Sequence, residues 1–293
     1  MVALRLQPSL DYGVIDIHIH VAPWEMMHAP ILAQMQKNRQ HFEFLTSIAR
    51  DAGRLIGIMD EAGIARAGII NYVAPEIMGF TFEANRFSAD YVKQHRDRLF
   101  AHGSIDPIHS KDPEGELSLL LDEWGIAAIK IHPPHQGIAP NAYLEGNTIL
   151  PTVYEGCSRR GVPVVLHTGT TIFKGARIKY GDPILIDDVA CDFPDLKIVL
   201  AHAGRPLWTE TARFLVKRHP HVYMDLSGIP PQRIPRWFPD LDRLADKVLW
   251  GTDWPGPGVP DMGTNLRAFL KQDLDQTSLR RMLRDNALKL FYP

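Results

Sequence analysis

Short runs of apolar residues recur along this chain, and longer stretches with helical spacing of apolar positions separate them. Eight runs are candidate strands: residues 14–20, 67–73, 99–105, 126–132, 162–168, 196–202, 221–226 and 247–253. Near-continuous apolar character is typical of strands that are buried on both faces of a sheet. Eight strands alternating with helices predict an α/β fold, a single (β/α)8 TIM barrel, with one domain over residues 1–293.

The stretches between the strands complete this prediction. Helices are expected at residues 50–63, 83–95, 112–125, 147–161, 182–194, 206–220 and 235–246, and a last one at 277–293. Residues 21–49 form a long loop insertion after the first strand, rich in aromatic residues and methionine. Such a loop on a barrel serves as a lid or a pocket wall. A surface helix that fills a gap is an equally open alternative.

Polar side chains stand where several of the predicted strands end. They are His18, His20, Lys130, His167, His202 and Asp253. The carboxyl ends of barrel strands meet at one face, which is where this fold carries its chemistry. We therefore expect these six side chains to converge around a metal ion.

Strand alternation predicts which neighbours share a face with these residues. His18 and His20 both project inward if either does, with Asp16 below them. The same rule places Lys130 beside His132 and Asp253 beside Gly251. It also pairs Val165 with His167, and Leu200 with His202.

The residue types fit metal-assisted hydrolysis. Imidazole and carboxylate donors favour zinc, with manganese or iron as alternatives. A divalent ion lowers the pKa of its water from 15.7 to about 7, and a neighbouring aspartate can move the proton. The chain has no GxSxG or CxxC motif, so the chemistry does not depend on a serine or cysteine nucleophile.

The motifs IDIHIH, KIH, VVLHTG, VLAHAG, LWGTDWP and DNALKLF together resemble the amidohydrolase superfamily over essentially the whole chain. Their spelling is most similar to the branch with small-lactone hydrolases and with decarboxylases of aromatic acids and of aminocarboxymuconate semialdehyde. The resemblance implies that His18 and His20 bind a first metal beside Asp253, which takes the proton from water. His167 and His202 would bind a second metal. In one-metal members, His167 binds the single ion and His202 polarises the substrate.

Lys130 is the residue that distinguishes the two-metal version of this site from the one-metal version. The resemblance implies that a lysine here reacts with carbon dioxide and bridges two ions as a carbamate. Burial beside cations lowers the pKa of a lysine and makes the neutral amine accessible. The decarboxylases of this branch generally lack the lysine. The alternative is an unmodified Lys130 that pairs with an acid such as Asp253 or binds a substrate carboxylate.

Four further residues each have two interpretations. Arg205 presents a planar fork for a substrate carboxylate or carbonyl, or forms a salt bridge that caps the helix after the sixth strand. His132 contacts substrate or orients the PPHQG loop. Asp225 accepts a hydrogen bond from a ligand histidine or from the backbone. His102 is expected to be a hydrogen-bonded core histidine, not a ligand.

Composition limits the classes of molecule that this protein is expected to bind. A formal net charge of -2 over 293 residues gives no basic footprint for nucleic acid, so we expect a small-molecule substrate. No apolar run approaches the ~20 residues of a membrane span. The first residues lack the core of a signal peptide, and Cys157 and Cys191 have no metal-like spacing, which favours a cytoplasmic protein. A homo-oligomer is an open alternative.

The sequence therefore predicts a metal-dependent hydrolase that uses a metal-activated water on a lactone, ester or amide of a small organic acid. The first alternative is a metal-dependent decarboxylase, or carboxy-lyase, of an aromatic or enolic acid. The second is a catalytically silent barrel that serves as a scaffold.

Overall fold

A ring of eight parallel strands forms the centre of the molecule in the computed structural model, which describes residues 10–37 and 42–292. The strands are β1 (Val14–Ile19), β2 (Ile64–Ile70), β3 (Leu99–Gly103), β4 (Ala128–Ile131), β5 (Val164–His167), β6 (Ile198–Ala201), β7 (Val222–Asp225) and β8 (Val248–Leu249). Each pairs with the next in sequence. Backbone bonds between the ends of β1 and β8, such as Asp253 N to His18 O at 2.8 Å, close the ring. The predicted (β/α)8 barrel is confirmed.

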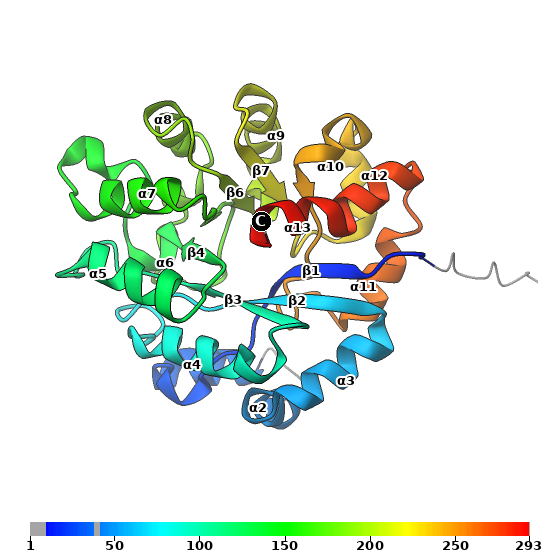
Figure 1. The fold of residues 1–293 in the computed structure, drawn as a ribbon, viewed down its shortest axis with the longest axis horizontal. Coiled ribbons are helices and arrows are strands. Elements are labelled where there is room, and N and C mark those ends of the chain that lie inside the picture. The colour runs from blue at the N-terminus through cyan, green and yellow to red at the C-terminus, as the bar shows by residue number, and fades with distance from the viewer. Residues whose placement is uncertain (1–9, 38–41, 293) are drawn as a thin grey trace, which may run out of the picture.

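Helices surround the strands on the outside of the ring (Figure 1). They are α3 (Ala52–Ala62), α4 (Glu83–Val92), α5 (Pro113–Ser118), α7 (Ile149–Arg159), α8 (Leu185–Asp192), α9 (Thr209–Arg218), α10 (Ile234–Trp237), α11 (Met262–Phe269) and α12 (Gln276–Arg280). Aspartate caps start several of them, as Asp51 does for α3 by accepting from Gly53 N at 2.9 Å. Within the described ranges, no helix combines the length and apolar character that crossing a bilayer requires.

The insertion after β1 contains more helix than the predicted loop. A 3-10 turn at Trp24–Met26 precedes α1 (Ala29–Lys37) and α2 (Phe42–Arg50). Leu45 and Ile48 of α2 are buried in the outer core, and the Trp24 and Phe42 rings lie 5.4 Å apart. The amphipathic spacing of α2 was present in the sequence, but two short helices within an insertion lack the length that makes such a pattern distinctive.

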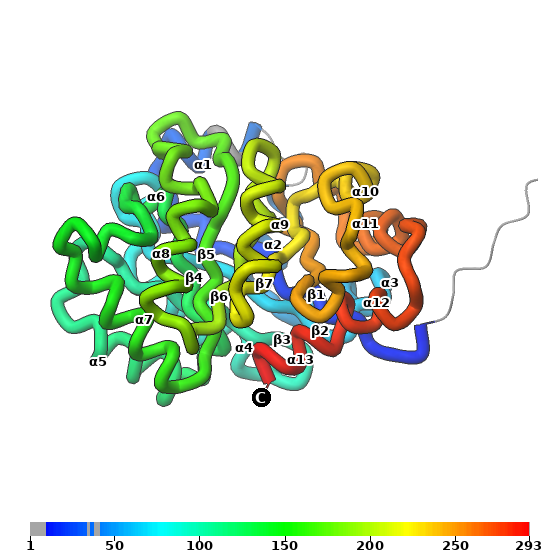
Figure 2. The backbone as a smooth tube through the Cα atoms, turned by 90° about the horizontal axis from the view of Figure 1, so that it is seen from above, coloured from blue at the N-terminus to red at the C-terminus, as the bar shows by residue number. Residues whose placement is uncertain are grey.

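The hydrophobic core has an outer and an inner part. The outer part fills the space between strands and helices, and the inner part fills the barrel. The inner cluster contains Ile15, Ile17, Phe100, Ala128, Val165, Val199, Ala201, Tyr223 and Leu249, together with Ala287, Leu290 and Phe291 of the last helix. This helix, α13 (Asn286–Phe291), lies across one end of the ring (Figure 1), and α1 and α6 (Pro133–Gln136) lie toward the opposite side (Figure 2). One end of the barrel is therefore sealed by apolar packing.

Candidate active site

A pocket of about 370 Å³ lies at the carboxyl ends of the strands. All eight predicted site residues line it: His18, His20, Lys130, His132, His167, His202, Arg205 and Asp253. The barrel thus brings together residues that are up to 235 positions apart in the chain (253 − 18). What each one can do depends on its hydrogen bonds.

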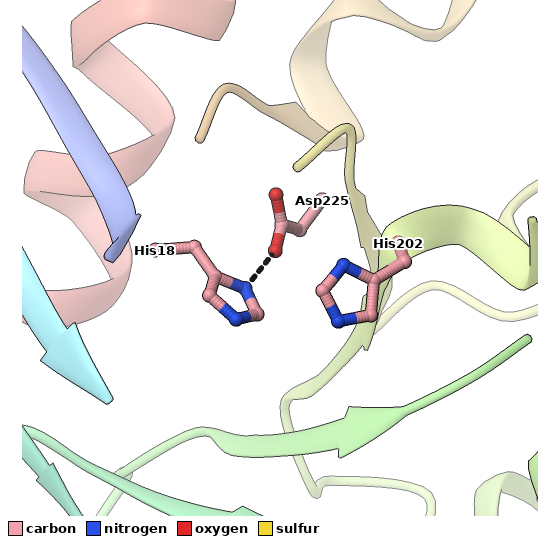
Figure 3. Close-up of side chains that lie close together, drawn as sticks. All are labelled: His18, His202 and Asp225. Carbon is pink, nitrogen blue, oxygen red and sulfur yellow. Dashed lines mark hydrogen bonds and ion pairs between the residues drawn. The ribbon is translucent and has the colours of Figure 1, made fainter. Parts of the chain in front are cut away.

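His18 is fixed by residues from the end of β7. Its Nδ1 lies 2.6 Å from Asp225 Oδ2 and 3.0 Å from Ser227 Oγ (Figure 3 shows the contact with Asp225). A carboxylate only accepts hydrogen bonds, so His18 donates from Nδ1 and keeps a lone pair on Nε2. Burial lowers the pKa of His18 to about 4, which keeps the ring neutral. Nε2 is buried and has no hydrogen-bond partner among the described residues.

His20 is oriented in the same way and faces Asp253. Its Nδ1 lies 2.9 Å from the carbonyl oxygen of Ile70, to which it donates. Its Nε2 lies 3.1 Å from Asp253 Oδ1, and His18 Nε2 lies 3.7 Å from that same oxygen. With neutral rings, two imidazole lone pairs would face a carboxylate oxygen, and such an arrangement is favourable only with a proton or a cation between them. These donors fit a divalent metal ion.

His167 and His202 stand beside this group. The His202 ring centroid lies 4.7 Å from that of His18 and 4.8 Å from that of His167. His202 Nδ1 lies 3.1 Å from the Ser227 carbonyl, so it donates there and leaves Nε2 as an acceptor. His167 Nε2 is buried without a hydrogen-bond partner in the described parts of the chain. The potential ligand atoms of His18, His20 and Asp253 lie within 4.8 Å of one another, a group that does not include His167 or His202.

The predicted pairing of Leu200 with His202 on one strand face is wrong. Val199 and Ala201 belong to the inner cluster, and Leu200 to the outer core. The strand β6 ends at Ala201, and His202 has a left-handed φ of 65°. This conformation is rare for a residue other than glycine. It turns the His202 side chain into the pocket out of the strand's alternation.

Asp253 also has a left-handed φ of 65°. Backbone strain of this kind is common at functional sites, where surrounding contacts hold it in place. Burial opposes ionisation of Asp253, but the hydrogen bond with His20 and the charge of Arg205 hold its pKa well below the usual range. Asp253 is therefore a carboxylate at neutral pH.

Lys130 is buried and lines the base of the pocket. Its Nζ has no hydrogen-bond partner within residues 10–37 and 42–292. The alternative in which Lys130 pairs with Asp253 is therefore wrong. Burial lowers the pKa of Lys130 to about 8, so the neutral amine is accessible near neutral pH.

Arg205 lines the pocket, and its salt bridge is not the one that the capping alternative predicted. Its Nη2 donates to Asp253 Oδ2 at 2.8 Å, so it forms an ion pair inside the site and not a cap on α9. The Nε of Arg205 is buried and has no hydrogen-bond partner among the described residues. One edge of the guanidinium thus remains available to a bound molecule.

His132 belongs to a stack of imidazole rings. Its centroid lies 3.6 Å from that of His135 and 3.8 Å from that of His167. Its Nδ1 accepts from His135 N at 3.4 Å, the loop-orienting contact that one interpretation expected, and it also lines the pocket. His135 contacts Tyr72 Oη at 2.8 Å and Thr171 Oγ1 at 2.6 Å. His135, Tyr72 and Thr171 were not among the predicted site residues, although the PPHQG motif was a visible signal for His135.

The upper pocket wall is apolar. It includes Trp24, Met27, Met78, Phe80, Phe173 and Trp237. Trp24 and Met27 come from the insertion after β1, which therefore contributes a wall, while its helices pack on the outside. Met78 and Phe80 lie on the loop between β2 and α4, Phe173 lies on the loop after β5, and Trp237 ends α10; sequence alone does not bring these segments together.

The prediction of a hydrogen-bonded His102 is wrong. Both ring nitrogens are buried without a hydrogen-bond partner in the described ranges. The ring packs against those of Phe100 and Phe291, at centroid distances of 5.5 and 5.3 Å. It stands on the inner face of β3, where the apolar end of the barrel gives way to the polar end.

Comparison with known proteins shows which family this chain belongs to. A family model described as amidohydrolase matches residues 15–292. A 2-pyrone-4,6-dicarboxylate hydrolase of Comamonas testosteroni is 28% identical over 41% of this chain and 52% of its own length. The match thus spans about half of that relative.

Solved structures agree with the fold. An uncharacterised TIM-barrel protein of Bordetella bronchiseptica has a TM-score of 0.77 at 22% identity, covering 95% of this chain and 98% of its own. A probable 2-pyrone-4,6-dicarboxylic acid hydrolase of Acinetobacter baumannii, with citric acid bound, has 0.67 at 16%, over 96% and 99%. A 5-carboxyvanillate decarboxylase of Novosphingobium aromaticivorans, complexed with manganese, has 0.67 at 16%, over 97% of both chains. At such identities these likenesses concern the fold.

Proposed function

Because this chain belongs to the amidohydrolase family, we propose that it is a metal-dependent hydrolase of a small organic acid with a lactone, ester or amide bond. The observation that carries this proposal is the convergence of His18 Nε2 and His20 Nε2 on Asp253 Oδ1, at 3.7 and 3.1 Å. Two imidazole nitrogens and a carboxylate oxygen that converge in this way are the donor set of a divalent metal site.

His18, His20 and Asp253 would hold a divalent ion, with His167 Nε2 as a further donor. Zinc, manganese and iron all suit this mixture of imidazole and carboxylate. When bound, such an ion lowers the pKa of water and polarises a carbonyl oxygen. Asp225 and the Ile70 carbonyl fix the rings of His18 and His20 through their Nδ1 atoms, which supports the orientation that ligation needs.

The chain's own residues would then manage the proton and the substrate. Asp253 is ionised and can accept a proton from water. His202 has an acceptor at Nε2, so it would assist as a proton acceptor and not as a donor to the carbonyl. Arg205 Nε and Lys130 Nζ line the pocket and have no hydrogen-bond partner in the part of the chain that the structure describes. Both donors suit a carboxylate or a carbonyl oxygen.

The pocket supports a small substrate with an apolar body. Its volume is in the range of small-molecule sites, and aromatic residues form much of its wall. The relative from Comamonas, which this chain matches over about half of its length, is named as the hydrolase of a dicarboxylate. This agrees with the presence of two cationic residues, Arg205 and Lys130, in the pocket.

A carboxy-lyase of an aromatic acid is the second candidate. The aromatic wall favours it, because it suits a planar ring. The similar fold of the 5-carboxyvanillate decarboxylase, which contains manganese, agrees with this candidate. The single domain over residues 1–293, the cytoplasmic location and the homo-oligomer stay predictions.

The test uses protein loaded with zinc or manganese. A panel of lactones, esters and amides of small acids is assayed for hydrolysis, and hydroxybenzoates are assayed for carbon dioxide release. Asp253→Asn should lower kcat by about 10²–10⁴-fold while the circular dichroism spectrum stays unchanged. Turnover that survives both chelation and this substitution would refute a metal-dependent reaction, and release of carbon dioxide alone would select the second candidate.

A further inference from the structure

His135 bridges two hydroxyl groups in a part of the pocket that the proposed metal centre does not use. One ring nitrogen, Nδ1, lies 2.8 Å from Tyr72 Oη, and the other, Nε2, lies 2.6 Å from Thr171 Oγ1. All three residues line the pocket. Tyr72 follows β2, His135 belongs to α6, and Thr171 lies on the loop after β5. Three separate segments of the chain therefore meet in this row of hydrogen bonds.

The ring of His135 is neutral. Burial, followed by the charge of Lys130, lowers the pKa of His135 to about 3. The ring also stacks on that of His132, with centroids 3.6 Å apart, and positive charges on both rings would oppose this contact. A neutral imidazole has one N–H donor and one acceptor nitrogen. His135 must therefore donate to one hydroxyl and accept from the other.

The chemistry of the two hydroxyls sets the direction of these hydrogen bonds. A phenol is a stronger acid than an aliphatic alcohol, so it is the better donor and the weaker acceptor. Tyr72 therefore donates to His135 Nδ1, and His135 Nε2 donates to Thr171 Oγ1. Thr171 Oγ1 also accepts from Phe173 N at 3.3 Å. Both lone pairs of this oxygen are then used, and no described residue accepts its hydrogen.

We propose that the Thr171 hydroxyl donates this hydrogen to an uncharged oxygen of the substrate, so that Tyr72, His135 and Thr171 form a subsite for a carbonyl, ether or hydroxyl group. The inference rests on the proposed function and names its substrate class more closely. The Phe173 ring lies 5.1 Å from that of His135, so apolar surface adjoins the donor. Because the three groups are neutral, a carboxylate here would lose its water without gaining a direct partner of opposite charge.

The experiment compares the binding of matched probes to the full chain loaded with zinc. Calorimetric titration uses benzoates that carry either an acetyl group or an isopropyl group of the same shape, at the meta or the para position. Only the acetyl group has an acceptor oxygen. Isophthalate and terephthalate place a second carboxylate at the same two positions. They test whether the subsite takes a charged group.

Two conservative variants address the subsite. Thr171→Val removes the hydroxyl and keeps the shape of the side chain. Tyr72→Phe removes the donor that directs the hydrogen bonds toward Thr171. Thr152→Val is the matched control, because the Thr152 hydroxyl donates to the Thr148 carbonyl at 3.0 Å on an exposed part of α7. Circular dichroism and thermal melting verify the fold of each variant.

Wild type and Thr152→Val should bind at least one acetyl probe about 3–10-fold more tightly than its isopropyl partner. Thr171→Val should lose this preference and keep its affinity for the isopropyl probe. Tyr72→Phe should weaken the preference, because His135 Nε2 can then accept from Thr171. Equal affinities within both pairs in wild type, a preference that survives either substitution, or no binding of any probe would overturn the inference. A larger loss for the dicarboxylates than for the acetyl probes in Thr171→Val would also overturn it.

The same titrations on chelated protein separate this inference from the proposed function. The affinity that all probes share should fall when the metal is removed, because their common carboxylate binds at the metal centre. The preference for the acetyl group should remain, because it comes from Thr171. A shared affinity that did not change on chelation would count against the proposed metal centre and leave the subsite standing.

Discussion

The two ends of the barrel interior differ sharply although the same strands build them. Ala128 and Val165 belong to the apolar cluster that α13 seals, and two residues further along their strands stand Lys130 and His167. The apolar end is packed. The polar end contains buried atoms without hydrogen-bond partners among the described residues, including Lys130 Nζ and His167 Nε2. Buried polar atoms without a hydrogen-bond partner lower the free energy of unfolding. The apolar end therefore stabilises the fold, and the polar end lowers its stability but presents groups that can bind a ligand.

The largest expected effect is at the packed end. Phe100→Ala should lower the free energy of unfolding by about 3–5 kcal/mol, because it leaves a cavity against Phe291, whose ring centroid lies 5.2 Å away. Chemical denaturation measures the change. Phe44→Ala, at a side chain that is 46% exposed, is the control and should change stability by less than about 0.5 kcal/mol. Equal effects of the two substitutions would contradict the assigned role of this end.

The packed end is also the part that sequence predicts well. All eight predicted strands overlap observed ones, because a strand buried on both faces must be nearly all apolar. The polar end was predictable where a residue directly follows an apolar run, as with Lys130 and His167. Position in the strand alone is enough there, since barrel geometry gathers the strand ends.

The other features of the site depend on backbone conformation and on contacts between distant segments, which the local sequence around a residue does not specify. The left-handed φ of His202 broke the alternation that paired it with Leu200. The Arg205–Asp253 ion pair joins loops 48 positions apart. The prediction for His102 assumed that a buried ring finds a partner, which is usual, but the partner had to come from another strand and none is present within the described residues.

At the polar end, Lys130→Met should raise the stability of metal-free protein at pH 7 by about 1–3 kcal/mol, because it removes a buried donor that has no hydrogen-bond partner among the residues described. The folded-state pKa of about 8 is below that of the unfolded chain. The cost of Lys130 is therefore fully present below pH 8 and declines as pH rises toward about 10.4. The gain from the substitution should shrink over that range in denaturation curves.

Lys247→Met is the control for that substitution. Burial also lowers the pKa of Lys247, but its Nζ donates to the carbonyls of Val216 and His219, at 3.0 and 2.7 Å. We expect Lys247→Met to destabilise the protein. If both substitutions destabilised it, the cost assigned to Lys130 would be wrong.

Asp225→Asn tests whether His18 needs its anchor. We expect metal affinity to fall about 10–100-fold, as for other residues that orient a ligand histidine. Competition with a chromophoric chelator measures the change. Asp187→Asn is the control, because Asp187 contacts His219 at the same 2.6 Å on the outside of the barrel. A similar loss in both variants would show that the effect is not specific to the metal centre.

The smallest effect concerns a surface charge that has partners, in contrast to Lys130. Burial opposes ionisation of Asp240, but hydrogen bonds from Arg213 and Lys217 lower its pKa to about 2. The unfolded value is higher, so Asp240 stabilises the fold above about pH 4, and this contribution is lost as pH falls toward 2. Asp240→Asn should cost about 0–1 kcal/mol at pH 7 and less at pH 3, as measured by urea denaturation. A deficit that grew on acidification would mean that the Asp240 carboxylate costs stability, and the contrast between partnered and unpartnered charges would fail.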